Sequence, residues 1–330
     1  MSRYPLPQRK VFSETGKTRR VGYEIEFAGL GLIEVANLVA DAVDGAVEKE
    51  TEAECTVSSG LGEFGVELDW QLGKNMARDR REARLEEVGV DDADDPLMEW
   101  ITTTAAQIAP IEIVCPPIPM DELDQLDPII DGLRSAGARG TAASPVYAFG
   151  VHINPELPDL ETGTVAKYIL AFSLCQDWLV KANDVDLARR ITPYINLFPD
   201  EYIRKLIEQQ DATLKEIIEC YLKHNPTRNR ALDMTPLFRH LDEDLLTTHL
   251  DDERIKARPT FHYRLPNSTP EKTGWSLSES WRTWCVVEAL AGNQSQLQAI
   301  TDQWLEYKSH TLNLGDPPWF SDLDNLHANL

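Results

Sequence analysis

The feature that most constrains the fold is a strict two-residue alternation in the segment RVGYEIEF, residues 20–27. Val21, Tyr23, Ile25 and Phe27 fall on one side of an extended chain, and a glycine and two glutamates fall on the other. A helix would scatter these residues around its axis. The segment is therefore predicted to be a strand with one buried face and one polar face.

The same alternation returns at several later points of the chain. Two strands around a glycine-rich turn are predicted within 50–72, a short strand in PIEIVCPPI, and further strands in YAFGVHINPE and TFHYRLPN. The polar faces of these strands contain, in chain order, Glu24 and Glu26, Glu67 and Asp69, Glu112, His152 and Asn154, and His262 and Arg264. Their other faces are aliphatic or aromatic and are expected to pack on helices.

Helical spacing of apolar residues occupies most of the remaining chain, over 32–47, 121–137, 165–182, 201–222 and 278–309. The predicted strands lie in 20–154 and again near 260, with a helical block at about 160–255 between them. This order predicts an α+β fold with a mainly antiparallel sheet. Residues 1–19 are polar and basic and are expected to form an arm, followed by a single domain over 20–330.

Composition excludes several classes of function. The 330 residues include 32 Lys and Arg against 55 Asp and Glu, a net charge of −23, which argues against non-specific nucleic-acid binding. No apolar run approaches the roughly 20 residues that span a bilayer, so no membrane role is expected. Five widely spaced cysteines without a C-x-x-C pair suggest reduced thiols in a cytoplasmic protein.

One glycine motif has the spacing of a dinucleotide-binding fingerprint. Gly60, Gly62 and Gly65 spell G-x-G-x-x-G, but a dinucleotide fingerprint must follow a strand and open a helix. The residues that follow, VELDW, alternate as a strand, so the glycines are predicted to form a hairpin turn.

The polar strand faces suggest metal chemistry. Alternate residues on one strand face lie roughly 7 Å apart, and carboxylates at that spacing repel unless they are solvated, protonated or bridged by cations. Oxygen ligands from several strands suit Mg²⁺ or Mn²⁺, and an imidazole suits Mn²⁺. Alternatively, these residues have structural roles. Glu24 and Glu26 would then lie on a solvated outer face, His152 would be a hydrogen-bonded core histidine, and Arg264 would be a buried ion-pair partner. Because each predicted strand has such residues on its polar face, the pattern favours a sheet surface that binds metal ions and phosphate groups.

Four blocks in order, RVGYEIEF, EIVCPPI, GVHINPE and ARPTFHYRLPN with a Trp-rich helix after it, resemble the amidoligase family. That family belongs to the carboxylate–amine ligase superfamily, with glutamate–cysteine ligase and glutamine synthetase. The resemblance covers roughly residues 19–292. It implies a glutamine-synthetase-like curved antiparallel sheet with helices on its outer face, which holds ATP and two or three Mg²⁺ or Mn²⁺ ions.

The resemblance also implies roles for individual residues. Glu24, Glu26, Glu112 and His152 match metal ligands, and Arg264 falls where an arginine faces the phosphates. His262 and Asn154 are expected beside the nucleotide, and Asn154 stands where some relatives have a second histidine. Glu67 or Asp69 is expected to hold a further metal or the amine, and Arg258 the substrate carboxylate.

The implied reaction is ATP-dependent amide formation through an acyl phosphate in a catalytic domain at 20–330. Its partners are a small-molecule or peptide carboxylate, such as a γ-glutamyl group, and an amine. A guanidino phosphotransferase, a metal-dependent hydrolase and a non-catalytic acidic scaffold are the alternatives. The sequence contains no signal that sets the oligomeric state.

Overall fold

The computed structural model describes residues 3–12, 14–51, 53–68, 110–143, 148–191, 193–209, 211–310 and 315–330. Asp69 and the acidic segment 74–96 lie outside the described residues. Every strand pair recorded in the sheet is antiparallel, and helices make up most of the rest, so the predicted α+β class with an antiparallel sheet is confirmed.

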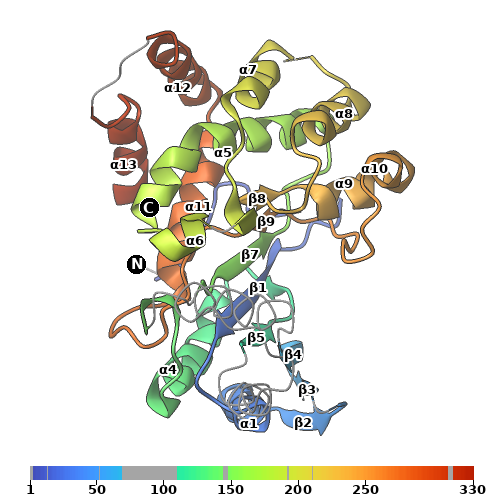
Figure 1. Cartoon of the computed structure of the whole chain (residues 1–330), viewed down its shortest axis with the longest axis vertical. Coiled ribbons are helices and arrows are strands. Elements are labelled where there is room, and N and C mark those ends of the chain that lie inside the picture. The colour runs from blue at the N-terminus through green and yellow to red at the C-terminus, as the bar shows by residue number, and fades with distance from the viewer. Residues whose placement is uncertain are drawn as a thin grey trace, which may run out of the picture.

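A nine-stranded sheet runs through the molecule in the order β2-β3-β4-β5-β1-β7-β9-β8, with β6 paired to β1 off this path (Figure 1). The predicted glycine-rich turn is a hairpin between β3 and β4, as its strand alternation indicated. The strands are β1 (Arg20–Phe27), β2 (Ala46–Lys49), β3 (Glu54–Ser59), β4 (Gly62–Leu68), β5 (Ile111–Val114), β6 (Ile118–Pro119), β7 (Val151–Pro155), β8 (Leu232–Asp233) and β9 (His262–Tyr263).

Helices occupy the regions that the apolar spacing indicated. In Figure 1, α1 and α4 lie beside the first half of the sheet, and the helical block lies around its late strands. The helices are α1 (Leu32–Val43), α4 (Asp127–Ala136), α5 (Thr162–Ala182), α6 (Leu187–Ile191), α7 (Asp200–Glu208), α8 (Leu214–His224), α9 (Thr235–Leu241), α10 (Glu243–His249), α11 (Leu277–Gly292), α12 (Gln294–Tyr307) and α13 (Phe320–Ala328).

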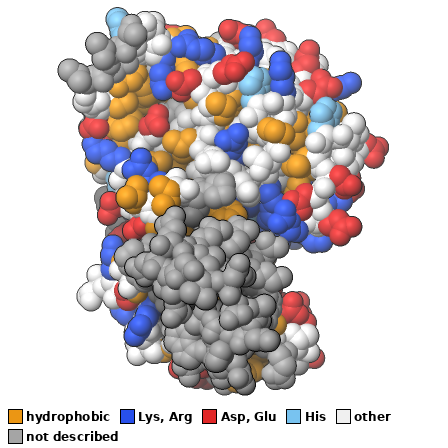
Figure 2. Space-filling model, in the orientation of Figure 1, with side chains coloured by type: hydrophobic (Ala, Val, Ile, Leu, Met, Phe, Trp, Pro, Cys, Tyr) orange, Lys and Arg blue, Asp and Glu red, His pale blue; other side chains and the backbone are white. Residues whose placement is uncertain are grey.

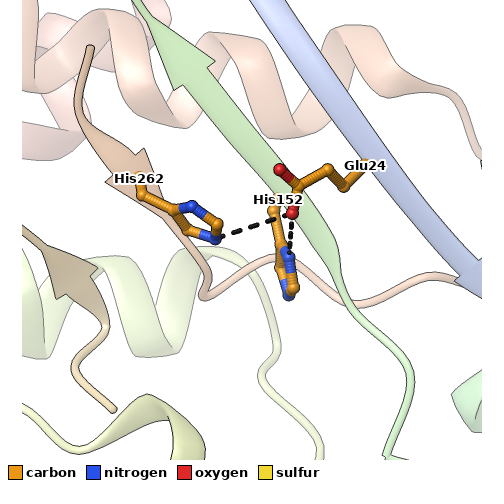
Figure 3. A group of neighbouring side chains, drawn as sticks. All are labelled: Glu24, His152 and His262. Atoms are coloured by element: carbon orange, nitrogen blue, oxygen red, sulfur yellow. Dashed lines mark hydrogen bonds and ion pairs between the residues drawn. The ribbon is translucent and has the colours of Figure 1, made fainter. Parts of the chain in front are cut away.

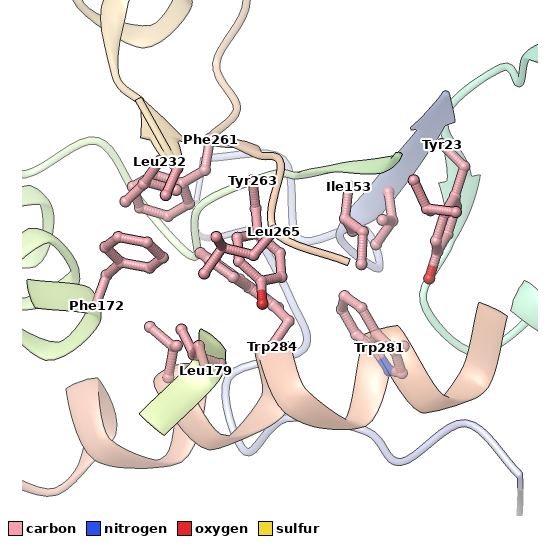
Figure 4. Packing of buried hydrophobic residues seen from close by; sticks show 14 of the residues in the cluster. Tyr23, Ile153, Phe172, Leu179, Leu232, Phe261, Tyr263, Leu265, Trp281 and Trp284 are labelled. Atoms are coloured by element: carbon pink, nitrogen blue, oxygen red, sulfur yellow. The ribbon is translucent and has the colours of Figure 1, made fainter. Parts of the chain in front are cut away.

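The alternation of β1 is realised as predicted. Its four apolar side chains, at positions 21, 23, 25 and 27, are fully buried. Figure 4 shows Tyr23 and Ile153 near Trp281, and Tyr263 near Trp284, with both tryptophans projecting from α11. Burying an aromatic or aliphatic side chain of this size contributes roughly 1.5–3 kcal/mol. This apolar layer fixes which face of each strand remains for chemistry.

The N-terminal residues lie against the domain. The Trp281 indole donates to the Pro5 carbonyl, and Tyr4 is buried with its hydroxyl 2.6 Å from an Asp127 carboxylate oxygen. Arg19 is completely buried and forms an ion pair with Glu288 at 2.7 Å. These contacts join residues 4–19 to α4 and α11.

Two other expectations concern the chain as a whole. The side chains of all five cysteines are buried, and their prediction as reduced thiols stays a prediction. Among the helices that the structure describes, none combines the length and apolar character that a bilayer crossing requires.

Candidate functional site

A row of glutamates crosses the sheet. Glu26, Glu112 and Glu67 lie next to one another near its middle, and the exposed Glu54 of β3 faces Glu67 at the outer end. The antiparallel register places Glu67 of β4 opposite Glu112 of β5, and Glu112 opposite Glu26 of β1. Residues directly opposite on neighbouring strands have Cβ atoms about 5 Å apart. Three residues that lie far apart in sequence therefore become neighbours on one face.

A second group of polar side chains surrounds Glu24, two residues before Glu26 on the same face of β1. His152 of β7 is opposite Glu24 in the register, and its Nδ1 lies 2.9 Å from Glu24 Oε2. His262 Nε2 of β9 lies 3.7 Å from the same oxygen, and Asn154 Nδ2 donates to Glu24 Oε1 at 3.0 Å. Figure 3 shows both imidazoles directed toward the Glu24 carboxylate from two different strands.

The carboxylates are not on a solvated outer face. The side chains of Glu24 and Glu26 are only 12% and 11% exposed, and the two histidines are buried. Gly150 N donates to Glu26 Oε2 at 2.6 Å, and His152 Nε2 lies 3.6 Å from Glu26 Oε1. The solvated-face interpretation of the Glu-x-Glu pattern therefore does not describe this protein.

The charge states follow from this burial. Burial, followed by the charges of Glu24, Glu26 and Glu67, raises the pKa of Glu112 well above its ordinary value. The protonated Glu112 carboxyl is then the hydrogen-bonding partner of Glu67. A cation at this place would displace that proton, because a metal ligand must be ionised.

The pKa of Glu24 shifts in the opposite direction to that of Glu112. Burial alone would raise its pKa, but His262, His152 and Arg264 outweigh burial and hold the pKa of Glu24 well below its ordinary value. Burial and the Arg264 charge hold the pKa of His262 well below its ordinary value, so its imidazole is neutral and keeps a lone pair. An ionised carboxylate beside a neutral imidazole is the form that binds a metal ion.

Among the described residues, two sets of side chains meet the geometric needs of a cation. Within each set, one potential ligand atom per residue lies within 4.8 Å of the others; the sets are Glu24, His152 and His262, and Glu26, Glu112 and His152. In the described part of the chain, two buried acceptor-capable atoms beside Glu24 have no hydrogen-bond partner, Asn154 Oδ1 and His262 Nε2. Buried polar atoms without partners are rare, so the residues present fit a bound cation.

Arg264 extends the site along the sheet. Arg264 is only 8% exposed. Its guanidinium donates to Asp233 of β8 at 3.1 Å, while Nε has no hydrogen-bond partner among the described residues. Asp233 also accepts from the Thr235 hydroxyl. Arg258 Nη1 lies 3.5 Å from Glu24 Oε1. Both arginines named from the sequence therefore lie at the site.

A cavity of about 90 Å³ opens beside these residues, lined by Glu24, Asp233 and His262 among others. Four cationic side chains belong to the same lining, and we call them the cationic lining: Arg228, Arg254, Lys256 and Arg258. Lys and Arg side chains also gather on the surface where the chain leaves α10 (Figure 2). A concentration of cations in a chain of net charge −23 marks a place for anions.

Three of these four cations were missed by the sequence analysis. Arg228 follows α8, and Arg254 and Lys256 follow α10, in segments without strand or helix periodicity. Arg254 forms an ion pair with Asp252 at 2.6 Å. Burial, followed by the charge of Arg264, lowers the pKa of Arg228. The only available signal was the basic spacing in ERIKAR, which surface loops share.

A larger hollow of about 680 Å³ lies between α1 and α4. Its described lining contains carboxylates from Glu34 and Asp41, but no histidine and no cation. The smaller cavity, where ionisable groups of both signs converge, is therefore the candidate site.

Of the residues named from the sequence, the structure brings together Glu24, Glu26, Glu67, Glu112, His152, Asn154, Arg258, His262 and Arg264. The predicted strand TFHYRLPN is shorter than expected, because only His262 and Tyr263 pair as a strand. The carbonyl groups just beyond them accept bonds from the Arg189 guanidinium instead.

Comparison with known proteins gives the family. No curated protein sequence matches this chain. A family model described as "Putative amidoligase enzyme" matches residues 17–286, which include every site residue named above. The match spans most of the 330 residues, and the chain therefore belongs to the amidoligase family.

Proposed function

We propose that this amidoligase is ATP-dependent and joins a carboxylate to an amine through an acyl phosphate, on a glutamine-synthetase-like sheet. The observation that carries the proposal is the meeting of two opposite groups at one cavity. Buried carboxylates and imidazoles suited to metal ions lie beside the cationic lining suited to anions. A reaction between ATP and a carboxylate needs both, because its reactants repel each other.

Mg²⁺ or Mn²⁺ ions are the cations we assign to Glu24, Glu26, Glu112 and His152. Such ions neutralise phosphate oxygens and polarise the phosphoryl group. The chain's own contribution is to keep Glu24 ionised and His262 neutral without metal, as their pKa shifts indicate. Glu24 and His262 are thus in metal-binding form in the folded protein, whereas Glu112 keeps a proton that a metal ion would displace.

In the first step the substrate carboxylate attacks the γ-phosphorus of ATP. The bond from that phosphorus to the β,γ-bridging oxygen breaks, and ADP leaves. We assign Arg264 to offset the charge that spreads over the transferred phosphoryl group. Arg258, with its guanidinium beside Glu24, is assigned to the substrate carboxylate. Phosphoryl transfer depends mainly on positioning and charge compensation, which a set of fixed cations supplies.

In the second step the ammonium form of the amine first loses one proton and the neutral amine attacks the acyl carbon. Phosphate then leaves, and the nitrogen loses its second proton to the leaving phosphate. We choose Glu67 for the amine because it is the hydrogen-bonding partner of Glu112 on the side away from Glu26. We assign Glu67, with Asp69 as the alternative, to holding the amine as its ammonium form. A glutamate at this position also accepts the first proton.

The first experiment measures thermal unfolding with Mg²⁺–ATP, Mn²⁺–ATP, metal alone and ATP alone. A ligand that binds only the folded state at 100 times its Kd adds about 2.7 kcal/mol of stability. We expect a rise with metal and ATP together that Glu26→Gln abolishes. The absence of a rise at millimolar nucleotide contradicts ATP dependence.

The second experiment identifies the acyl phosphate without knowledge of the amine. Carboxylic acids are screened with Mg²⁺–ATP and hydroxylamine, which converts an acyl phosphate into a hydroxamate and free phosphate. Hydroxamate in proportion to ADP supports the ligase. A phosphorylated guanidine without free phosphate indicates a phosphotransferase, and hydrolysis without nucleotide indicates a hydrolase.

A further inference from the structure

The short helix α6 inserts one charged side chain into the interior behind the site. Arg189 is 3% exposed, whereas Leu187 and Ile191 on the same helix are 69% and 76% exposed. An isolated guanidinium at this depth is costly unless it is fully hydrogen-bonded. The burial of this one side chain therefore requires an explanation.

The guanidinium is held by the segment that follows β9. Arg189 Nη1 donates to the carbonyls of Leu265 at 2.6 Å and Pro266 at 2.7 Å, and Nη2 donates to the carbonyl of Arg264 at 2.6 Å. A further contact at 3.3 Å reaches the side-chain oxygen of Asn267. Arg189 thus fixes the backbone of Arg264, whose side chain donates to Asp233 in the cavity lining.

The same guanidinium lies against the turn that supports Glu26. Gly150 has no Cβ, and a Cβ built there would lie 2.5 Å from Arg189 Nη2 and 3.4 Å from His152 Nε2. Gly150 N donates to Glu26 Oε2, and Gly150 O accepts from Glu26 N at 3.1 Å. The absence of a side chain at position 150 therefore allows the guanidinium to approach both metal-ligand candidates.

The charge of Arg189 persists in this setting. Burial lowers the pKa of Arg189 to about 10, and the negative charge of Glu26 opposes that decrease. The group is therefore cationic at neutral pH.

We propose that Arg189 is a positioning residue of the active site, which holds the Gly150 turn with Glu26 and His152 on one side and the Arg264 backbone on the other. This proposal rests on the proposed function above, because it concerns the same metal ligands. No contact of Arg189 with substrate is implied. Its role is to set the distance between the metal-binding strands and the phosphate-facing arginine.

The test compares Arg189→Lys and Arg189→Met with Arg190→Met. Arg190 is the exposed next residue of α6, so its variant is the matched control. Lysine retains the charge but cannot make the forked bonds to three carbonyls, and methionine loses both. Mn²⁺ binding is measured on the folded proteins by electron paramagnetic resonance, separately from turnover.

We expect Arg189→Met to weaken Mn²⁺ binding by roughly 10- to 100-fold, the range found when a residue that orients a metal ligand is removed. Arg189→Lys should retain part of the affinity, and Arg190→Met should bind as wild type. Turnover should fall in kcat with little change in the KM for ATP. In Arg189→Ala, added guanidinium ion at millimolar concentration should restore part of both properties.

A folded Arg189→Met protein with wild-type Mn²⁺ affinity and kcat overturns the proposal. If the Arg189 variants do not fold, Asn267→Ala decides, since it removes one anchor and leaves the guanidinium in place. Unchanged Mn²⁺ affinity in that variant contradicts the proposal, and a smaller loss in the same direction supports it. Wild type that binds no Mn²⁺ contradicts the proposed function itself, which is a distinct result.

Discussion

The acidic and the cationic halves of the site are built in different ways. The acidic half, with Glu24, Glu26 and Glu112, lies on neighbouring strands whose register sets every cross-strand distance. The cationic lining, by contrast, comes from the segments that follow α8 and α10. Strand neighbours hold ligands in place for a small cation, whereas loops allow long side chains to adjust to an anion.

The two halves also differ in burial. The carboxylates beside the imidazoles are about a tenth exposed, while the Arg258 side chain is 47% exposed. Charges interact more strongly where water is excluded, so a change in the acidic half should cost more than one in the cationic lining. Substitutions in the acidic half should therefore lower activity most, and those in the cationic lining less.

Glu26→Gln should have the largest effect. The amide keeps an oxygen that can accept from Gly150 N, so the fold is preserved, but the negative charge is lost. We expect ligation to fall by more than the roughly 100-fold typical of an outer partner of a metal ligand. Hydroxamate formation measures the turnover of the variant, and circular dichroism checks that it is folded. Normal turnover would exclude Glu26 as a metal ligand.

Arg264→Lys tests the point where the two halves meet. Lysine keeps a positive charge beside Asp233, so the buried carboxylate is not left without a partner. The forked geometry toward the phosphoryl group is lost, and we expect kcat to fall by about 10²- to 10³-fold. A change confined to the KM for ATP would show that Arg264 only binds the nucleotide.

Arg228→Met and Lys256→Met test the cationic lining directly. We expect each to raise the KM for the anionic reactants by about tenfold, which corresponds to roughly 1.4 kcal/mol, with kcat nearly unchanged. The effect should shrink as salt increases. Lys272, exposed and absent from the cavity lining, provides the control variant Lys272→Met. Equal losses in kcat would show that the cationic lining takes part in the chemical step.

Glu112→Gln should have the smallest effect, on metal-free stability. Because the pKa of Glu112 is raised, the folded protein holds a proton that the unfolded chain releases above pH 4.5. Wild type therefore loses stability as pH rises from 4.5 through the raised pKa. Glutamine resembles the protonated acid, so the variant should avoid this loss and melt a few degrees higher at pH 8.

The same variant should match wild type below pH 4.5, where Glu112 is protonated in both the folded and unfolded states. Glu63→Gln, a change at an exposed glutamate of β4, is the control. Equal melting temperatures of Glu112→Gln and wild type at pH 8 would show that Glu112 is ionised in the folded protein. With Mn²⁺ present, wild type should melt at a higher temperature than Glu112→Gln, since only wild type is stabilised by binding the ion.

Much of the acidic half could be predicted from the sequence. The alternation around Glu24, Glu112 and His152 identified each strand and its polar face, because a two-residue period has one physical solution. The pairing of Glu26 with Glu112 could not be predicted, because register depends on which strands meet. Glu67 and Asp69 illustrate the limit: Glu67 faces Glu112, whereas Asp69 lies outside the described residues.

The sequence by itself determined the α+β class, the antiparallel strands, the apolar layer under Trp281 and Trp284, and the family resemblance. The places of Arg228, Arg254 and Lys256 in the cavity lining, and of Arg189 behind it, became evident from the folded chain alone. The physical reason is that periodicity encodes which way a side chain faces within its own element. Residues of short helices and loops have no such period, and their positions depend on packing between distant segments.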